Sequence, residues 1–246
     1  MRETLRQFGW TAYDHLGGLV LLNLIWTGLS LPWLGAGVAL FGVGRGLGGG
    51  AALCAGLVAL DLVLLSPPSV LLFLAGWNWA RKKEFRMGTL FRSLPGYALR
   101  AQGVGLMVAG LHLLFLANAF FYARFSGWIG LVLEWVMIWS VLGVGLAALF
   151  TFPLLVSQGG GVRGIFRQSL LLAVDNIGCS LGLLTAVSTG LLLGALSGIG
   201  LFCGMLALLA LLICVCFRRL ASRYTGEPLP EEPFRTWREL LRPWEH

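Results

Sequence analysis

The feature that most constrains this chain is a series of long apolar runs separated by short polar gaps. Basic residues gather in every second gap and at both ends, namely at 2–6, 81–100, 163–167 and beyond residue 217. Lys and Arg are concentrated in the cytoplasmic loops of membrane proteins, so this alternation indicates a chain that crosses a bilayer several times. Only Arg45 and Arg124 fall on the opposite side. We therefore expect both termini to lie in the cytoplasm.

Composition excludes an ordinary soluble domain. Charged residues make up 12% of the 246 residues, and mean hydropathy is +0.82. A soluble domain carries about 25% charged residues, so lipid must form part of the solvent here. We expect one all-α domain, a polytopic transmembrane helix bundle with the lipid bilayer as its main partner. The net charge of +7 is explained by topology and by attraction to anionic lipid headgroups, and nucleic acid is not an expected partner.

The apolar runs predict six core spans, because about 20 apolar residues cross the hydrocarbon core. They cover residues 16–34, 50–80, 101–122, 128–152, 169–193 and 199–217. The second run is too long for one straight helix, and a break is expected at Pro67-Pro68, where two backbone donors are missing. Residues 33–66 fit either a tight turn or a re-entrant hairpin. No small-residue cleavage site follows the first run, so we expect that span to be retained.

Both ends are predicted to be amphipathic interfacial helices, at 1–15 and at the end of the basic tail, 218–246. The apolar face of the tail alternates with arginines and consists of Phe234, Trp237, Leu241 and Trp244. Such a face suits a helix lying in the headgroup layer, and it could instead dock a cytosolic partner. Membrane anchoring is the favoured interpretation.

A row of small residues marks the fifth predicted span. It recurs every four residues and consists of Gly178, Gly182, Ala186, Gly190, Gly194 and Gly198. Lipid tails are as apolar as leucine, so membrane helices associate through close backbone approach at small residues. We predict a helix-packing seam here and no ligand site.

Four ionisable residues fall within the apolar runs: Asp61, His112, Glu134 and Asp175. Charges at membrane depth are costly and are functional candidates by default. One hypothesis is a polar pathway, with His112 and a carboxylate relaying protons or contacting a solute. The other is structural pairing, in which Arg124 reaches Glu134 and Arg167 reaches Asp175. Structural pairing is favoured for Glu134 and Asp175, and the two hypotheses are equal for His112 and Asp61.

Enzyme motifs are absent from the sequence. Its three histidines lie far apart and form no HExxH, and no phosphate-binding loop or GxSxG occurs. The five cysteines contain no CxxC and have no zinc spacing. We therefore predict no catalytic residues, no metal and no cofactor.

Two predicted cytoplasmic stretches, 88–94 and 164–170, resemble each other. Each follows a predicted span that runs from the outside to the cytoplasm, and each precedes a predicted span that runs back to the outside. This pattern is typical of a weak internal repeat, as in some transporters, or of convergence among helix entries at a membrane surface. Convergence is the favoured interpretation.

Several scattered segments together resemble the YesL family of bacterial membrane proteins, whose domain is of unknown function. They are Tyr13-Asp14-His15-Leu16-Gly17, Asn23-Leu24-Ile25-Trp26, Leu31-Pro32, Phe152-Pro153-Leu154-Leu155 and Phe166-Arg167-Gln168-Ser169. The resemblance implies a multi-pass protein of the bacterial cytoplasmic (inner) membrane, associated with carbohydrate uptake. It supplies no catalytic residues. This chain departs from the family between Pro32 and Pro67, where it is longer.

These observations predict a non-enzymatic accessory or scaffold subunit of a membrane complex, such as a solute-uptake system, with other membrane-protein subunits as partners. The alternative is a small-solute or proton-coupled transporter that uses the polar residues at membrane depth. A continuous polar cavity joining His112 and Asp61 would favour transport. A dry interior with an exposed apolar flank would favour a scaffold.

Overall fold

The structure is a computed structural model, and it is helical throughout the part of the chain that it describes. It describes residues 2–46, 51–83, 86–197, 203–226 and 229, with the backbone alone for 2, 33, 34, 36–46, 51–64 and 195. The helices are α1 (Arg2–Asp14), α2 (Leu16–Gly46), α3 (Ala51–Ala80), α4 (Met87–Tyr122), α5 (Trp128–Gln158), α6 (Val162–Asp175), α7 (Ile177–Ser197) and α8 (Met205–Thr225). The all-α prediction is confirmed.

Long apolar helices make this a helical membrane protein. Among the described residues, α4, α5, α7 and α8 are long and apolar enough to cross a membrane. A fifth candidate is the pair formed by α1 and α2, which bends by 80° at the break between them. Four or five candidate spans are thus found, and six are not.

Helix α2 is longer than predicted, and the break predicted in α3 is not present. Helix α2 continues past residue 34 to Gly46, and α3 runs unbroken through Pro67 and Pro68. Residues 33–66 therefore form the far halves of two long helices, apart from 47–50, which lie outside the described residues. Next to the prolines, Ser69 Oγ donates to the Leu65 carbonyl at 2.8 Å and accepts from Trp26 Nε1 at 3.1 Å. Such support from serine side chains and neighbouring helices lets membrane helices tolerate proline.

The fifth predicted span, 169–193, is divided in the structure. Helix α6 ends at Asp175, and α7 begins at Ile177 after Asn176, whose φ is −120° and ψ 43°. Polar side chains compensate the break, because Asn176 Nδ2 donates to the Leu172 carbonyl at 3.2 Å and Ser180 Oγ lies 3.1 Å from the Ala173 carbonyl. Asp175 thus lies at a helix junction and not two turns inside a span.

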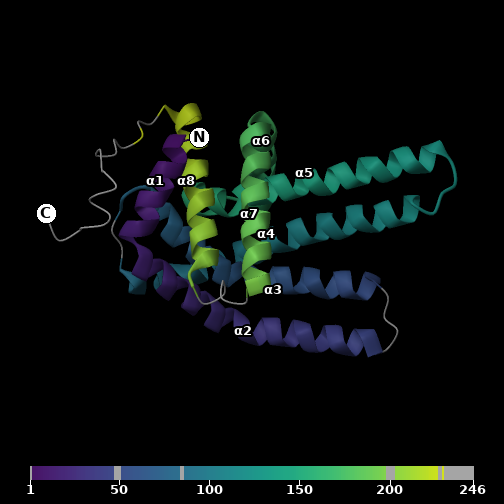
Figure 1. The fold of residues 1–246 in the computed structure, drawn as a ribbon, viewed down its shortest axis with the longest axis horizontal. Helices are drawn as coiled ribbons and strands as arrows, with labels where there is room; N and C mark the ends of the chain where they lie inside the picture. The colour runs from purple at the N-terminus through teal and green to yellow at the C-terminus, as the bar shows by residue number, and fades with distance from the viewer. Residues whose placement is uncertain (1, 47–50, 84–85, 198–202, 227–228, 230–246) are drawn as a thin grey trace, which may run out of the picture.

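Helices α2 to α5 lie side by side in chain order, and α7 and α8 run across them near one end (Figure 1). We call that end, with α1, α6, α7 and α8, the base, and the last turn of α2 together with residues 123–127 after α4 the tips. Transmembrane helices tilt by about 20° on average. Helices α2 to α5 and the crossing helices α7 and α8 therefore cannot all span one flat bilayer.

The core lies in the base, where the second halves of α3 and α5 meet α8. Its largest fully buried side chains include Phe150, Phe217 and Leu71. Phe73 stacks on Phe152 with ring centroids 5.2 Å apart, and Trp77 meets Phe217 at 5.5 Å. Towards the tips, by contrast, large apolar side chains of α4 and α5 are exposed.

Candidate functional site

His112 lies half-buried on α4 and faces α5. Its Nδ1 lies 2.9 Å from the Val108 carbonyl, which can only accept, so Nδ1 carries the proton in this contact. A Cβ built on Gly145 of α5 would lie 3.9 Å from Nε2. The other ring nitrogen, Nε2, therefore faces α5 at a point where a glycine leaves room.

The predicted partners of His112 are not assembled around it. Glu134 lies half-buried on α5, and the pairing of Glu134 with Arg124 is not formed among the described residues. Asp61 belongs to α3, but its side chain lies outside the described residues. Among the described residues, His112 is therefore not shown to contact either carboxylate.

Asp175 meets a partner that the sequence did not suggest. Its Oδ2 accepts a hydrogen bond from the Tyr224 hydroxyl at the end of α8, and Asn176 Nδ2 also lies 2.8 Å from that hydroxyl. The predicted contact with Arg167 is not formed among the described residues. These groups tie the α6–α7 junction to α8. Asp175 and Tyr224 are exposed, and Asn176 is half-buried.

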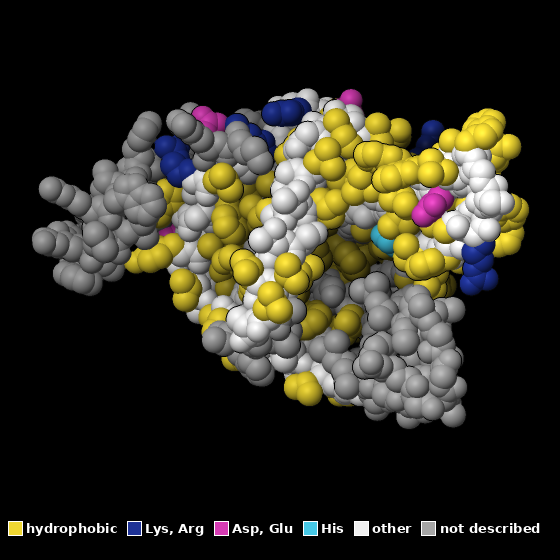
Figure 2. Space-filling model, turned by 45° about the vertical axis from the view of Figure 1, so that its right-hand side comes forward, with side chains coloured by type: hydrophobic (Ala, Val, Ile, Leu, Met, Phe, Trp, Pro, Cys, Tyr) yellow, Lys and Arg dark blue, Asp and Glu magenta, His cyan; other side chains and the backbone are white. Residues whose placement is uncertain are grey.

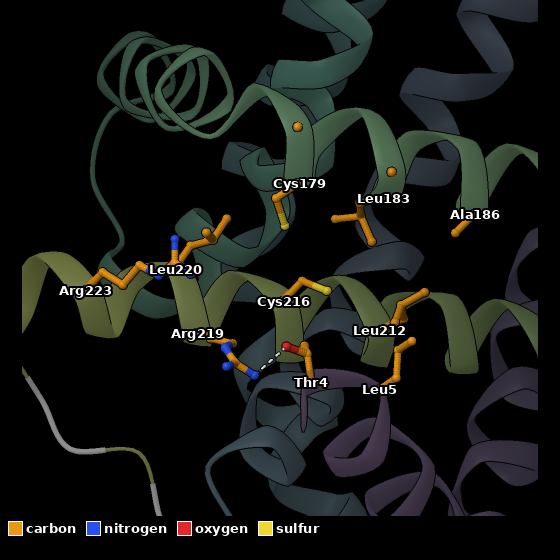
Figure 3. Close-up of a pocket in the computed structure, with 12 residues that line it drawn as sticks. Thr4, Leu5, Cys179, Leu183, Ala186, Leu212, Cys216, Arg219, Leu220 and Arg223 are labelled. Atoms are coloured by element: carbon orange, nitrogen blue, oxygen red, sulfur yellow. Dashed lines mark hydrogen bonds between the residues drawn. The ribbon is translucent and has the colours of Figure 1, made fainter. Parts of the chain in front are cut away.

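Hollows in the described structure include three that lie in the base. The first, of about 290 Å³, lies between α7, α8 and the start of α1 (Figure 3). The second lies among the last turns of α3, α5 and α8, and the third where α1 and α2 meet the start of α8. His112, Glu134 and Asp175 line none of them.

The row of small residues on α7 faces α8, as a packing seam should, but only one end is closed. A Cβ on Gly190 would lie 2.9 Å from Leu209 Cδ2, whereas a Cβ on Gly178 would meet nothing within 4 Å. Gly178, Gly182 and Ala186 line the first hollow, and Gly194 is buried. Gly198 lies outside the described residues.

Basic side chains secure the helix ends of the base. Arg218 Nη1 donates to the carbonyl of Ala80, the last residue of α3. Arg219 contacts α1 twice, through Nη2 to Glu3 Oε2 at 2.8 Å and through Nη1 to Thr4 Oγ1 at 2.7 Å. These arginines therefore hold the base together, besides belonging to the basic clusters from which the sequence predicts a cytoplasmic side.

Sequence reasoning missed the role of Asn23, which is fully buried on α2. Its Oδ1 accepts from the backbone N–H groups of Leu206 at 3.0 Å and Ala207 at 3.4 Å. These are unpaired donors in the first turn of α8, whose own cap position is Gly204. Asn23 thus caps a helix about 180 residues away. The signal was present, because an asparagine within an apolar run needs a hydrogen-bond partner.

The predicted interfacial anchor, Phe234, Trp237, Leu241 and Trp244, lies outside the described residues. Within the described part of the chain, no group of three or more His, Cys, Asp or Glu side chains could hold a metal ion. Cys179 and Cys216 face each other across the first hollow (Figure 3).

No protein-family model, curated protein or solved structure matches the chain. The resemblance to the YesL family therefore stays a prediction.

Proposed function

We propose that this protein is a non-enzymatic accessory or scaffold subunit of a membrane complex, and that its α4–α5 hairpin binds another membrane protein. The observation that carries the proposal is a row of tryptophans on α5, which we call the tryptophan face. Trp128, Trp135 and Trp139 are 76%, 52% and 64% exposed. Their spacing of seven and four residues puts them on one side of the helix.

The distribution of charge supports an arrangement in which α4 and α5 cross the bilayer. Arg45 and Arg124 lie at the tips, and the other Lys and Arg of the described helices and loops lie in the base. From Arg100 to Tyr122, α4 extends about 33 Å at 1.5 Å per residue, close to the hydrocarbon thickness. We therefore assign the base to the cytoplasmic face, with α7 and α8 lying across it.

The depth of the tryptophans argues for a protein partner. Trp128 begins α5 and suits the outer interface, where tryptophan is enriched. Trp139 lies about 16 Å further along the helix, near the middle of the bilayer. A buried indole N–H usually has an acceptor, and the described residues give none to Trp135 or Trp139. Lipid tails offer none, but another membrane protein can.

Figure 2 is consistent with this proposal, because hydrophobic side chains cover much of the face in view and charged ones lie mostly at its edges. Membership of the YesL family, a bacterial cytoplasmic membrane location and a solute-uptake complex as the partner are part of the proposal. They are supported by the sequence resemblance described above.

The test is extraction of the native membrane into lipid-polymer discs, followed by purification and mass measurement of the intact complex. We expect a second membrane polypeptide in fixed ratio, and a photoreactive residue placed at position 139 should cross-link to it. Trp135→Leu/Trp139→Leu should release it, whereas Leu106→Ala/Leu114→Ala on α4 should not. A protein that is always purified alone, or a complex that keeps its composition in the tryptophan variant, would contradict the proposal.

A small-solute or proton-coupled transporter is the second candidate, supported by the half-buried His112. An imidazole ring can accept a proton at one nitrogen and release one from the other, and so can relay protons. Reconstituted vesicles with a trapped pH dye test this candidate: a proton flux that His112→Ala abolishes and Asn118→Ala preserves would favour transport. A flux no greater than in empty vesicles would contradict it.

A further inference from the structure

The hollow between α7 and α8 is a wedge that we call the groove. It is closed where Gly190 meets Leu209 and opens towards Gly178, where the structure leaves free space. The two helices run antiparallel from their connection at residues 198–204, so the wide end lies beside the last turns of α8. The groove is therefore narrow at one end and wide at the other.

The chemistry of the lining changes along the same direction. Apolar or small side chains form both walls, with Leu183 and Ala186 on α7 and Leu212 on α8. At the wide end the lining includes Arg219 and Arg223 (Figure 3). The groove is thus apolar along its length and cationic at its mouth.

The two arginines are not equivalent. Arg219 is held by Glu3 and Thr4 of α1, and Glu3 offsets part of its charge. Arg223 lies one turn further on, exposed, and no acidic side chain pairs with it among the described residues. Arg223 is therefore the main cation available to a ligand at the mouth.

We propose that the groove binds one acyl chain of an anionic phospholipid, with the lipid phosphate against Arg223 and, secondarily, Arg219. A phospholipid matches the groove in both respects. Its apolar acyl chain can pack against the apolar walls, and its negative phosphate can pair with the guanidinium groups at the mouth. This proposal does not depend on the tryptophan face.

The experiment uses the full-length purified protein, stripped of lipid by detergent exchange and titrated with phosphatidylglycerol or phosphatidylcholine of matched chains. Intact-mass measurement counts the lipids retained per chain. We expect one phosphatidylglycerol to be retained at a concentration at least fivefold lower than phosphatidylcholine, because each basic residue favours an anionic headgroup by about fivefold.

Two variants test the contributions of the mouth and of the walls to lipid binding separately. Arg223→Gln should lower the preference for phosphatidylglycerol about fivefold, and Arg163→Gln, an exposed arginine on α6, should leave it unchanged. Gly178→Leu should weaken binding of both lipids by filling the wide end. Its control is Gly110→Leu on α4, which likewise has nothing within 4 Å of a Cβ. Melting curves in detergent check that all four variants fold.

Four outcomes would overturn the proposal. The first is equal retention of both lipids by the parent protein, and the second is undiminished binding by a folded Gly178→Leu variant. The third is displacement of phosphatidylglycerol by millimolar inorganic phosphate, which would make the mouth a site for free anions. Occupation of the groove by a second polypeptide or by the C-terminal tail, detected by cross-linking to Cys179, would overturn it as well.

Discussion

The two halves of α5 are similarly apolar and differ only in what surrounds them. In the second half, from Val144 to Val156, most side chains are buried, and Phe150 and Leu155 are fully inaccessible. In the first half Trp128 and Trp139 are more than 60% exposed. Hydropathy therefore identifies a membrane-compatible helix, but it does not distinguish a core that the protein builds for itself from a surface left to lipid or to another protein.

The largest expected effect comes from truncating a buried side chain in the second half of α5. Phe150→Ala removes a ring that packs at 6.5 Å from the Phe217 ring and should cost about 3–5 kcal/mol of unfolding free energy, because the cavity loses its contacts on all sides. Trp139→Ala in the exposed half should stay within about 0.5 kcal/mol. Reversible unfolding of the purified protein in mixed detergent micelles measures both.

Equal destabilisation of the purified chain by Phe150→Ala and Trp139→Ala would contradict the difference between the two halves of α5. That result would mean that the first half of α5 is packed within the chain or in a dimer that survives purification. Cross-linking yields at several protein concentrations would distinguish these two causes.

The second prediction concerns the closed end of the α7–α8 seam. Gly190→Leu must displace Leu209, which already lies 2.9 Å from a Cβ at that position, and overpacking of this kind costs about 1–3 kcal/mol. Gly110→Leu, on the exposed side of α4, should be tolerated. The melting temperature in detergent gives the comparison. If Gly190→Leu inserts and melts like the parent, the seam is not a contact.

The sequence predicted those features of the fold that depend on side chains close together in the chain. The apolar runs predicted the helical class, both ends of α3, the starts of α2 and α5 and the end of α4, and the spacing of small residues marked the row on α7 in which Gly190 lies close to Leu209. Each of these follows from side chains near one another in the chain. The length of α2 and the unbroken α3 were not predicted, because glycine and proline are weaker breakers when neighbouring helices supply hydrogen bonds.

Contacts between distant residues could not be predicted. Nothing near Asn23 indicates that its partner is the first turn of α8, and nothing near Asp175 indicates Tyr224 in place of Arg167. Both depend on how α8 lies across the base, which is decided by packing and not by hydropathy. The same holds for the groove, because the spacing of Gly178 and Gly182 is equally compatible with a closed seam.

The third prediction compares two asparagines. Asn23→Ala should cost about 1–2 kcal/mol, because two donors of the first turn of α8 lose their buried acceptor. Asn118 bonds only to the Leu114 carbonyl of its own helix at 2.7 Å, and Asn118→Ala should change the unfolding free energy little. Unfolding in mixed micelles measures both, and equal effects would contradict the capping role of Asn23.

The smallest expected effect concerns the surface link between α8 and the α6–α7 junction. Tyr224→Phe removes the hydroxyl that donates to Asp175 and lies 2.8 Å from Asn176 Nδ2. Since the group is exposed, water replaces most of what is lost, and the melting temperature should hardly change. The junction itself should open more often, because α6 and α7 are separated there and α8 no longer restrains them.

Amide hydrogen exchange followed by peptide mass analysis resolves this local effect. Peptides covering 172–180 should exchange faster in Tyr224→Phe, while peptides from the second half of α5 should not change. Tyr122→Phe at the tip of α4 is the matched control, since the described residues give that hydroxyl no hydrogen-bond partner. Faster exchange throughout the base would instead mean that the Tyr224 link stabilises the whole core, and the base would then be one cooperative unit extending to its surface.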